Sequence, residues 1–338
     1  TADVRADLLS VLPGALIDLP GPRALLADGA AWEPAARDRA CLLRARPGTD
    51  ASTQDVAGHA RIVEPQRPTV ALRGVRWNGL WHDPRSAPAH FSALQLHGDP
   101  LLDAHWAPTV DWAVPAGLAS GAYAFRLQPQ GRPPVHASFF VSAAAGPSPR
   151  PTARVALWLP TYSYLAYGNA VEAMRGPAVT PLPRIDEQRL DALHPAHGRS
   201  LYERHADGQG VLWTGSRRPL WSVAPGHRPW QFVADSWLLD WLERSGIPCD
   251  VITDHDVHRR GADALAPYAA VLTGHHPEYV SEAMWNGLWR YLHGGGRLMY
   301  LGGNGYYWRT AVDEHDDLIE VRRAEDGTRP FVGAAGEA

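Results

Sequence analysis

The sequence predicts two kinds of structure in a chain of 338 residues: an N-terminal β-sandwich part and a parallel α/β sheet domain. Residues 66–145 contain short segments with apolar side chains at nearly every second position, and Pro and Gly interrupt them about every ten residues, as in a sandwich. Over residues 153–338, apolar runs alternate with helical patterns, as in a parallel sheet covered by helices. Residues 146–152, rich in Pro and small residues, are the predicted linker.

The strands of the β-rich part are expected to be short. Tyr123, Phe125 and Leu127 alternate with other residues, so their side chains would lie on one face of a strand. Similar patterns predict strands at Val70–Leu72, Phe91–Leu96, Tyr123–Leu127 and His136–Val141.

The α/β part begins with the continuous apolar run Val155–Leu159, which Pro160 ends as expected for a buried strand. Further buried strands are predicted at Asp250–Thr253, Ala269–Thr273 and Arg297–Leu301. The helical patterns between these runs would provide the crossover connections that parallel strands need.

Two helices are predicted in this part. The first stops before Gly246 and Pro248, and its apolar face consists of Val233, Trp237, Trp241 and Leu242. The second begins after Ser281, a residue type that caps helices, ends at Gly294–Gly296, and carries Trp285, Leu288, Trp289 and Leu292. Trp mostly provides buried area, so we expect most of the 14 Trp side chains to pack in the core.

Composition and missing motifs exclude several classes of function. A net charge of −4 argues against a nucleic acid or an anionic membrane as the main partner. No apolar run reaches the roughly 18–20 residues of a membrane span. Cys41 and Cys249 are too few for a disulfide framework or a thiolate metal site. The chain has no G-x-S-x-G, H-E-x-x-H or P-loop motif, and Gly302–Gly305 lacks the spacing of a dinucleotide-binding loop.

Tyr, His, Glu and Asn side chains follow three of the predicted strands, in the loops Thr161–Asn169, Gly274–Tyr279 and Gly302–Trp308. Ligands bind beyond the carboxyl ends of strands in such sheets, so these loops could converge on one site. Tyr and Glu oxygens suit a hard cation such as Fe3+, whereas zinc hydrolases normally use two or three His ligands. From the residues alone, ordinary packing of the tyrosines remains an alternative.

Two motifs, VLTGHHPEY at residues 271–279 and GGGRLMYLGGNGYYWR at residues 294–309, resemble the large (beta) subunit of N,N-dimethylformamidase and its relatives. Upstream segments resemble that family's β-rich part: Trp77–Gly79, Leu96–Asp99, Asp111–Pro115 and Ser120–Tyr123. The resemblance implies a glutamine-amidotransferase-like α/β fold. It also implies a mononuclear iron held by two tyrosinates and one glutamate.

Matched to the family's pattern, the first tyrosinate falls on Tyr167, the second on Tyr202 and the glutamate on Glu278. Tyr162 and Tyr164 are rivals for the first position. Three anionic oxygens would balance the charge of Fe3+ and leave positions open for water and substrate.

The resemblance also places His276 and Asn304 at catalytic positions. His276 would accept or deliver a proton, and Asn304 would stabilise the developing oxyanion. The implied function is iron-dependent hydrolysis of the C–N bond of small N-substituted amides such as N,N-dimethylformamide. A small-molecule amide would be the substrate, a homo-oligomer and a small subunit are possible partners, and the expected location is the cytoplasm.

Two other functions stay open: a non-catalytic carbohydrate- or peptide-binding module on a degenerate amidotransferase-like fold, and a zinc hydrolase of the same fold. The string Asp254–His258 looks like a set of metal ligands, but we expect a solvated loop. Family chains are longer, so residues 1–65 are expected to be part of a lectin-like β segment. Family members also continue well beyond Ala338, so a catalytic acidic residue from that region would not be visible in this sequence.

Overall fold

The structure is a computed structural model that describes part of the chain. The described residues are 70–73, 78–80, 91–95, 102–104, 106–128, 130–131, 134–143, 151–170, 198–204, 210–220, 222–225, 230–313 and 317–322. The chain divides into two compact units, one of residues 1–100, 203–213 and 320–338, the other of residues 101–202 and 214–319. The candidate site lies in the second unit.

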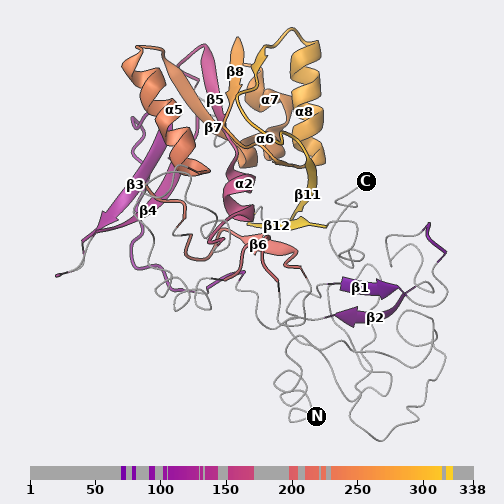
Figure 1. Ribbon diagram of the computed structural model, residues 1–338. Helices are drawn as coiled ribbons and strands as arrows, with labels where there is room; N and C mark the ends of the chain where they lie inside the picture. The colour runs from indigo at the N-terminus through magenta and orange to yellow at the C-terminus, as the bar shows by residue number, and fades with distance from the viewer. Residues whose placement is uncertain are drawn as a thin grey trace, which may run out of the picture. The chain divides into compact units, whose positions relative to one another are not determined.

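A parallel sheet forms the centre of the second unit (Figure 1). Its strand order is β10-β8-β5-β7, formed by Leu298–Met299, Ala270–Thr273, Val155–Leu159 and Cys249–Thr253. All neighbouring strands are parallel, and Leu157, Leu159 and Val251 are fully buried, as expected for strands covered on both faces. The predicted parallel α/β sheet is confirmed, although β10 is shorter than Arg297–Leu301.

Helices lie on both sides of these strands in Figure 1, with α5 (Phe232–Arg244) on one side. On the other side are α6 (Asp254–Arg260), α7 (Ala262–Leu265) and α8 (Glu282–His293). The predicted cap of α8 is confirmed, because Ser281 Oγ accepts a hydrogen bond from Met284 N at 3.3 Å. A short helix, α2 (Thr161–Ala166), follows β5 where we expected a loop.

The β-rich part contributes two antiparallel pairs. β1 (Val70–Arg73) pairs with β2 (Phe91–Gln95), and β3 (Gly121–Leu127) pairs with β4 (Val135–Val141). Phe140 of β4 packs against the core cluster that contains Leu157 and Phe232. The β3–β4 pair therefore contributes apolar surface to the same core as the parallel sheet.

A second sheet has the order β6-β12-β11-β9, formed by Trp213–Gly215, Leu318–Val321, Trp308–Val312 and Tyr279–Val280. β9 pairs in parallel with β11, with Tyr279 opposite Trp308. Because β9 directly follows the loop after β8, this pairing fixes the far end of that loop.

The expectation of a solvated loop at Asp254–His258 is wrong. These residues form most of α6, and Asp254 and Asp256 are 2% and 5% exposed. Thr253 and Asp256 form a capping box, in which Thr253 Oγ1 accepts from Asp256 N at 3.3 Å and Asp256 Oδ2 accepts from Thr253 N at 2.8 Å. The carboxylates thus serve the first turn of a helix.

The expectation that Trp packs mainly in the core is wrong for both long helices. Trp237 and Trp241 of α5 are 59% and 54% exposed, and Trp285 and Trp289 of α8 are 50% and 55% exposed. The buried face of α8 instead contains Gly287, where a Cβ atom would lie 2.7 Å from Gly261 Cα. This close backbone contact fixes the rotation of α8 and turns its Trp residues away from the core.

The remaining fold predictions fall largely outside the described residues. The segment 1–65 lies there entirely, as do most of the linker and parts of residues 66–145. The β-sandwich and the domain boundaries therefore stay predictions. Within the described part of the chain, no helix has the length and apolar character needed to cross a membrane.

Candidate functional site

The candidate site lies beyond the carboxyl ends of β5 and β8, where α2 and the segment Gly274–Glu278 follow these strands. Gly274 N donates to Trp158 O at 2.9 Å, which keeps this segment beside the end of β5. Tyr167 is the C-terminal cap of α2, and Glu278 directly precedes β9. Two neighbouring strands thus deliver a phenol and a carboxylate to one place, as the position of sites in parallel sheets predicts.

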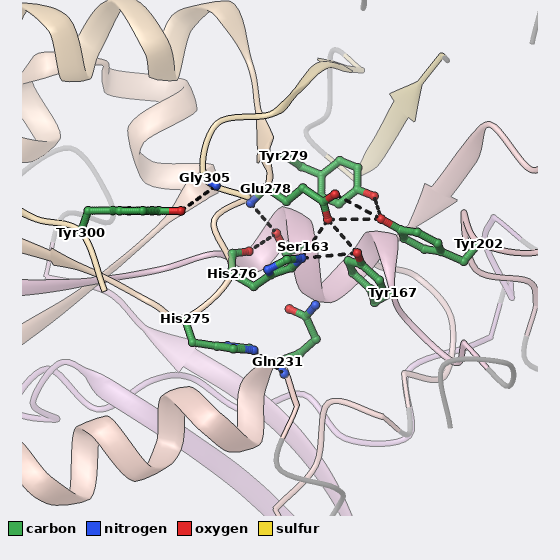
Figure 2. Close-up of polar contacts among 10 residues, drawn as sticks. All are labelled: Ser163, Tyr167, Tyr202, Gln231, His275, His276, Glu278, Tyr279, Tyr300 and Gly305. Atoms are coloured by element: carbon green, nitrogen blue, oxygen red, sulfur yellow. Dashed lines mark hydrogen bonds and ion pairs between the residues drawn. The ribbon is translucent and has the colours of Figure 1, made fainter. Parts of the chain in front are cut away.

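The carboxylate of Glu278 is the centre of a hydrogen-bonded cluster (Figure 2). Its Oε2 atom accepts from Tyr167 Oη at 2.8 Å and from Tyr202 Oη at 3.2 Å. His276 Nε2 lies 3.0 Å from the same oxygen and 3.4 Å from Tyr167 Oη. The structure therefore brings together four of the predicted site residues.

The two tyrosines of the cluster also stack on each other. The ring centroids of Tyr167 and Tyr202 are 4.1 Å apart, and the planes differ by 16°. The hydroxyl of Tyr279 lies 2.7 Å from the hydroxyl of Tyr202. Stacking and hydrogen bonding together hold the phenol oxygens on the same side as the Glu278 carboxylate.

The pKa of Glu278 is shifted down, whereas the pKa values of its tyrosine neighbours Tyr167 and Tyr279 are shifted up. Burial alone would raise the pKa of Glu278, but hydrogen bonds from His276, Tyr167 and Tyr202 outweigh it and hold the pKa below its usual value. Burial raises the pKa of Tyr167 well above the usual phenol value, and hydrogen bonding with Tyr202 and the charge of Glu278 add to the rise. Burial likewise raises the pKa of Tyr279. Without a cation, these shifts favour an ionised Glu278 carboxylate beside protonated phenols at Tyr167 and Tyr279.

Ser163 of α2 fixes the backbone that carries His276 and Glu278. Its hydroxyl donates to His276 O at 2.6 Å and accepts from Glu278 N at 3.2 Å. Both partners belong to the loop after β8, so the Ser163 side chain ties the backbone of His276 and Glu278 to α2.

The glycine-rich turn after β10, residues 302–305, contacts the backbone of the loop that carries His276 and Glu278. Gly303 N donates to His275 O at 3.0 Å, and Tyr306 N donates to Pro277 O at 2.7 Å. At Gly302, a Cβ atom would lie 2.6 Å from His275 O, which is too close for any side chain. The turn therefore packs directly against the backbone next to the site.

Asn304, the fifth predicted site residue, is not part of this hydrogen-bonded cluster. It is exposed and has a φ of 49° in the turn after β10. Among the described residues, no hydrogen bond joins its side chain to Tyr167, Tyr202 or Glu278. Its catalytic role stays a prediction.

The two rival tyrosines have other surroundings. Tyr164 Oη donates to Asp235 Oδ2 at 2.5 Å. Tyr162 is fully buried, with its ring centroid 4.9 Å from that of His255. Of the three tyrosines in this stretch, Tyr167 is the one hydrogen-bonded to Glu278.

Sequence reasoning missed the residues that precede α5. Trp230 places its ring centroid 5.6 Å from that of Tyr167 and 5.2 Å from that of His276. Gln231, the N-cap of α5, is 5% exposed, and Figure 2 shows its amide near His276 and Tyr167. No predicted strand precedes these residues, so no pattern in the sequence assigned them to the site.

The oxygens of the cluster suit a hard cation. The hydroxyls of Tyr167 and Tyr202 lie 2.8 and 3.2 Å from the same carboxylate oxygen of Glu278. A single ion could therefore contact all three side chains after small shifts. Within the described residues, His, Cys, Asp and Glu form no group of three or more that could hold a metal. The oxygens that gather at Glu278 instead come from Tyr167 and Tyr202.

Comparison with known proteins supports the resemblance in the sequence. A family model described as "N,N-dimethylformamidase beta subunit-like, C-terminal" matches residues 69–337. A protein of Paracoccus aminophilus named N,N-dimethylformamidase beta subunit is 34% identical over 297 residues, which cover 84% of this chain and 38% of that relative. A protein of the same name from Alcaligenes sp is 35% identical over 290 residues, covering 82% and 37%. The chain thus spans less than two fifths of the length of these relatives.

Proposed function

The chain belongs to the family of N,N-dimethylformamidase beta subunits, and we propose from this premise that it carries the active site of a metal-dependent amide hydrolase. The proposed substrates are small N-substituted amides such as N,N-dimethylformamide. The observation that carries the proposal is the convergence of Tyr167, Tyr202 and His276 on the buried carboxylate of Glu278.

We propose Tyr167, Tyr202 and Glu278 as the residues that would hold Fe3+. Bound there, the ion would supply Lewis acidity toward the amide carbonyl and lower the pKa of water. Fe3+ binding requires Tyr167 to lose its phenol proton, although the raised pKa shows that its surroundings favour the protonated form. Two phenolates and the carboxylate would then balance three positive charges, which offsets the cost of burying them.

The remaining groups of the site have roles that follow from their positions. His276 Nε2, within 3.0 Å of Glu278 Oε2, would hold a proton and deliver it to the departing amine. Trp230 provides an apolar wall beside Tyr167 and His276. Asn304 would stabilise the oxyanion if its turn moves toward the substrate.

Two broader features belong to the same proposal. The arrangement of the α/β unit is proposed to be glutamine-amidotransferase-like, with its site at the carboxyl ends of parallel strands. The curated relatives are named as beta subunits, so we propose that this chain works with a second subunit. Purification should therefore keep any protein that co-elutes with it.

Metal analysis combined with an amide screen tests the proposal. We expect about one iron per chain, a visible tyrosinate-to-iron absorption band, and release of dimethylamine from N,N-dimethylformamide. Tyr202→Phe should lose the band and the activity. The matched control Tyr123→Phe, whose hydroxyl donates to Ala119 O in a separate β3–β4 region, should keep both.

Three results would contradict parts of the proposal. Protein without stoichiometric metal and without amide hydrolysis would support a binding module instead. Zinc in place of iron would favour the zinc hydrolase. Retention of iron in Tyr202→Phe would remove Tyr202 from the ligand set.

A further inference from the structure

Among the described residues, the buried side-chain amide of Gln231 has no hydrogen-bond partner. The residue is 5% exposed, and neither Oε1 nor Nε2 has a partner in the part of the chain that the structure describes. Buried polar groups in folded proteins are nearly always hydrogen-bonded, so an unpaired one points to a group that binds there. The side chain also does not cap its own helix, since α5 has no side-chain cap hydrogen bond.

The amide is directed at the candidate site. In Figure 2 it extends from the backbone beside His275 toward His276 and Tyr167. Both atoms of the amide therefore lie at the edge of the Glu278 cluster.

The backbone of Gln231 is held in a conformation that favours glycine. Its φ is 51° and its ψ is −122°. For a residue with a Cβ atom this conformation costs free energy, and such residues concentrate at functional sites.

A defined set of contacts maintains this conformation. Gln231 N donates to His275 Nε2 at 3.3 Å, and Gln231 O accepts from Asp235 N at 3.2 Å. The carboxylate of Asp235 accepts in turn from His275 N at 2.7 Å. The loop after β8 and the first turn of α5 thus hold the Gln231 amide at the edge of the site.

We infer that Gln231 is a substrate-binding residue whose Nε2 donates a hydrogen bond to the carbonyl oxygen of the amide substrate. Its Oε1 would then accept from an N–H group on the same side of the substrate as the carbonyl. Primary amides such as formamide carry that N–H, whereas N,N-dimethylformamide does not. Gln231 is therefore a residue that discriminates primary amides from N,N-dimethylformamide. This inference rests on the proposed amide hydrolase function.

The test compares Gln231→Met with the wild-type protein on formamide and N,N-dimethylformamide. The substitution keeps the length of the side chain but removes both hydrogen-bonding atoms. We expect kcat/KM for N,N-dimethylformamide to fall about 10-fold and that for formamide about 100-fold, since one and two hydrogen bonds are lost. Iron content and the visible band should not change. The matched control Gln128→Met, exposed next to β3, should behave like wild type.

A second variant separates binding from a structural role. Gln231→Gly relieves the backbone conformation and removes the unpaired amide, so its melting temperature should equal or exceed that of wild type while kcat/KM falls. A lower melting temperature together with iron loss in both variants would show that Gln231 is structural. Unchanged kinetics in Gln231→Met, or an equal fall for both substrates, would also overturn the inference.

These outcomes are distinct from failure of the proposed function. If wild type holds iron and hydrolyses amides but Gln231→Met has normal kinetics, only the role of Gln231 is wrong. If wild type neither holds metal nor hydrolyses any amide, the proposed function fails and the role of Gln231 fails with it.

Discussion

Two buried carboxyl groups beyond the same parallel sheet have pKa values that are shifted in opposite directions. Glu278, after β8, is 4% exposed, and Asp254, directly after β7, is 2% exposed. Burial alone would raise both pKa values. Hydrogen bonds from His276 and Tyr167 nevertheless hold the pKa of Glu278 below its usual value, whereas the pKa of Asp254 is raised to about 8.

The difference lies in the surrounding groups. Asp254 accepts from Trp158 Nε1 at 2.7 Å and Tyr162 N at 2.8 Å, but these two neutral donors do not offset full burial beside Asp235 and Asp256. Glu278 has an imidazole and two phenols around it. Burial alone thus does not identify a cation site, and the type and number of donors decide whether a buried carboxyl stays ionised.

The largest expected effect comes from removing the charge of Glu278. Glu278→Gln keeps the shape of the side chain but takes away the charge on which the cluster converges. We expect loss of bound iron and a fall in kcat of at least about 100-fold, measured by metal analysis and amine release. Glu282→Gln, on the exposed face of α8, is the control. Full iron occupancy in Glu278→Gln would contradict the proposed ligand set.

A smaller effect is expected from a group one step away from Glu278. Tyr279→Phe removes the hydroxyl that lies 2.7 Å from Tyr202 Oη. Partners of metal ligands typically contribute about 10–100-fold to metal affinity, so the variant should bind iron that much more weakly. Competition with a chelator measures the affinity. An unchanged affinity would mean that the stack on Tyr167 alone positions Tyr202.

The raised pKa of Asp254 predicts a pH dependence of stability. Between the unfolded pKa of about 3.9 and the folded pKa of about 8, the folded protein holds a proton that the unfolded chain has released. Stability should therefore fall as pH rises through this range, by at most about 1.4 kcal/mol per unit. Asp254→Asn should flatten this slope. Urea unfolding at pH 5 and pH 8 measures it, and equal slopes in the two proteins would show that Asp254 keeps an ordinary pKa.

The smallest expected effect concerns the helix that Asp254 begins. Thr253→Ala removes the hydroxyl that accepts from Asp256 N in the α6 capping box. The free energy of unfolding should therefore fall by about 1 kcal/mol. Thermal unfolding measures the change. The slope between pH 5 and pH 8 should stay as in wild type, because the carboxyl of Asp254 keeps its two donors. A change of slope in Thr253→Ala would mean that the cap, and not burial, sets the acidity of Asp254.

Local patterns in the sequence predicted the strands of the parallel sheet. β5 and β8 are apolar runs that end at the site, and Ser281 marks the start of α8, so these elements depend on neighbouring residues alone. The rotation of α5 and α8 depends on long-range packing such as the contact between Gly287 and Gly261, so the exposed Trp faces could not be predicted from periodicity.

The candidate site was predicted in part. Tyr167, Tyr202, His276 and Glu278 came from resemblance, since Tyr202 is far along the chain from Tyr167 and no periodicity connects them. Gln231 could not be found, because its importance depends on a positive φ and on an unpaired amide, and a glutamine in a sequence signals neither.

Gly302 illustrates how a site can depend on the absence of atoms. A Cβ atom there would lie 2.6 Å from His275 O and 2.7 Å from Pro277 Cδ, so any replacement must displace the loop that carries His276 and Glu278. In a deep mutational scan, this glycine should therefore tolerate no substitution and score like a metal ligand, although it contributes no functional group. Intolerance to mutation alone would thus overstate the number of residues that take part in the chemistry.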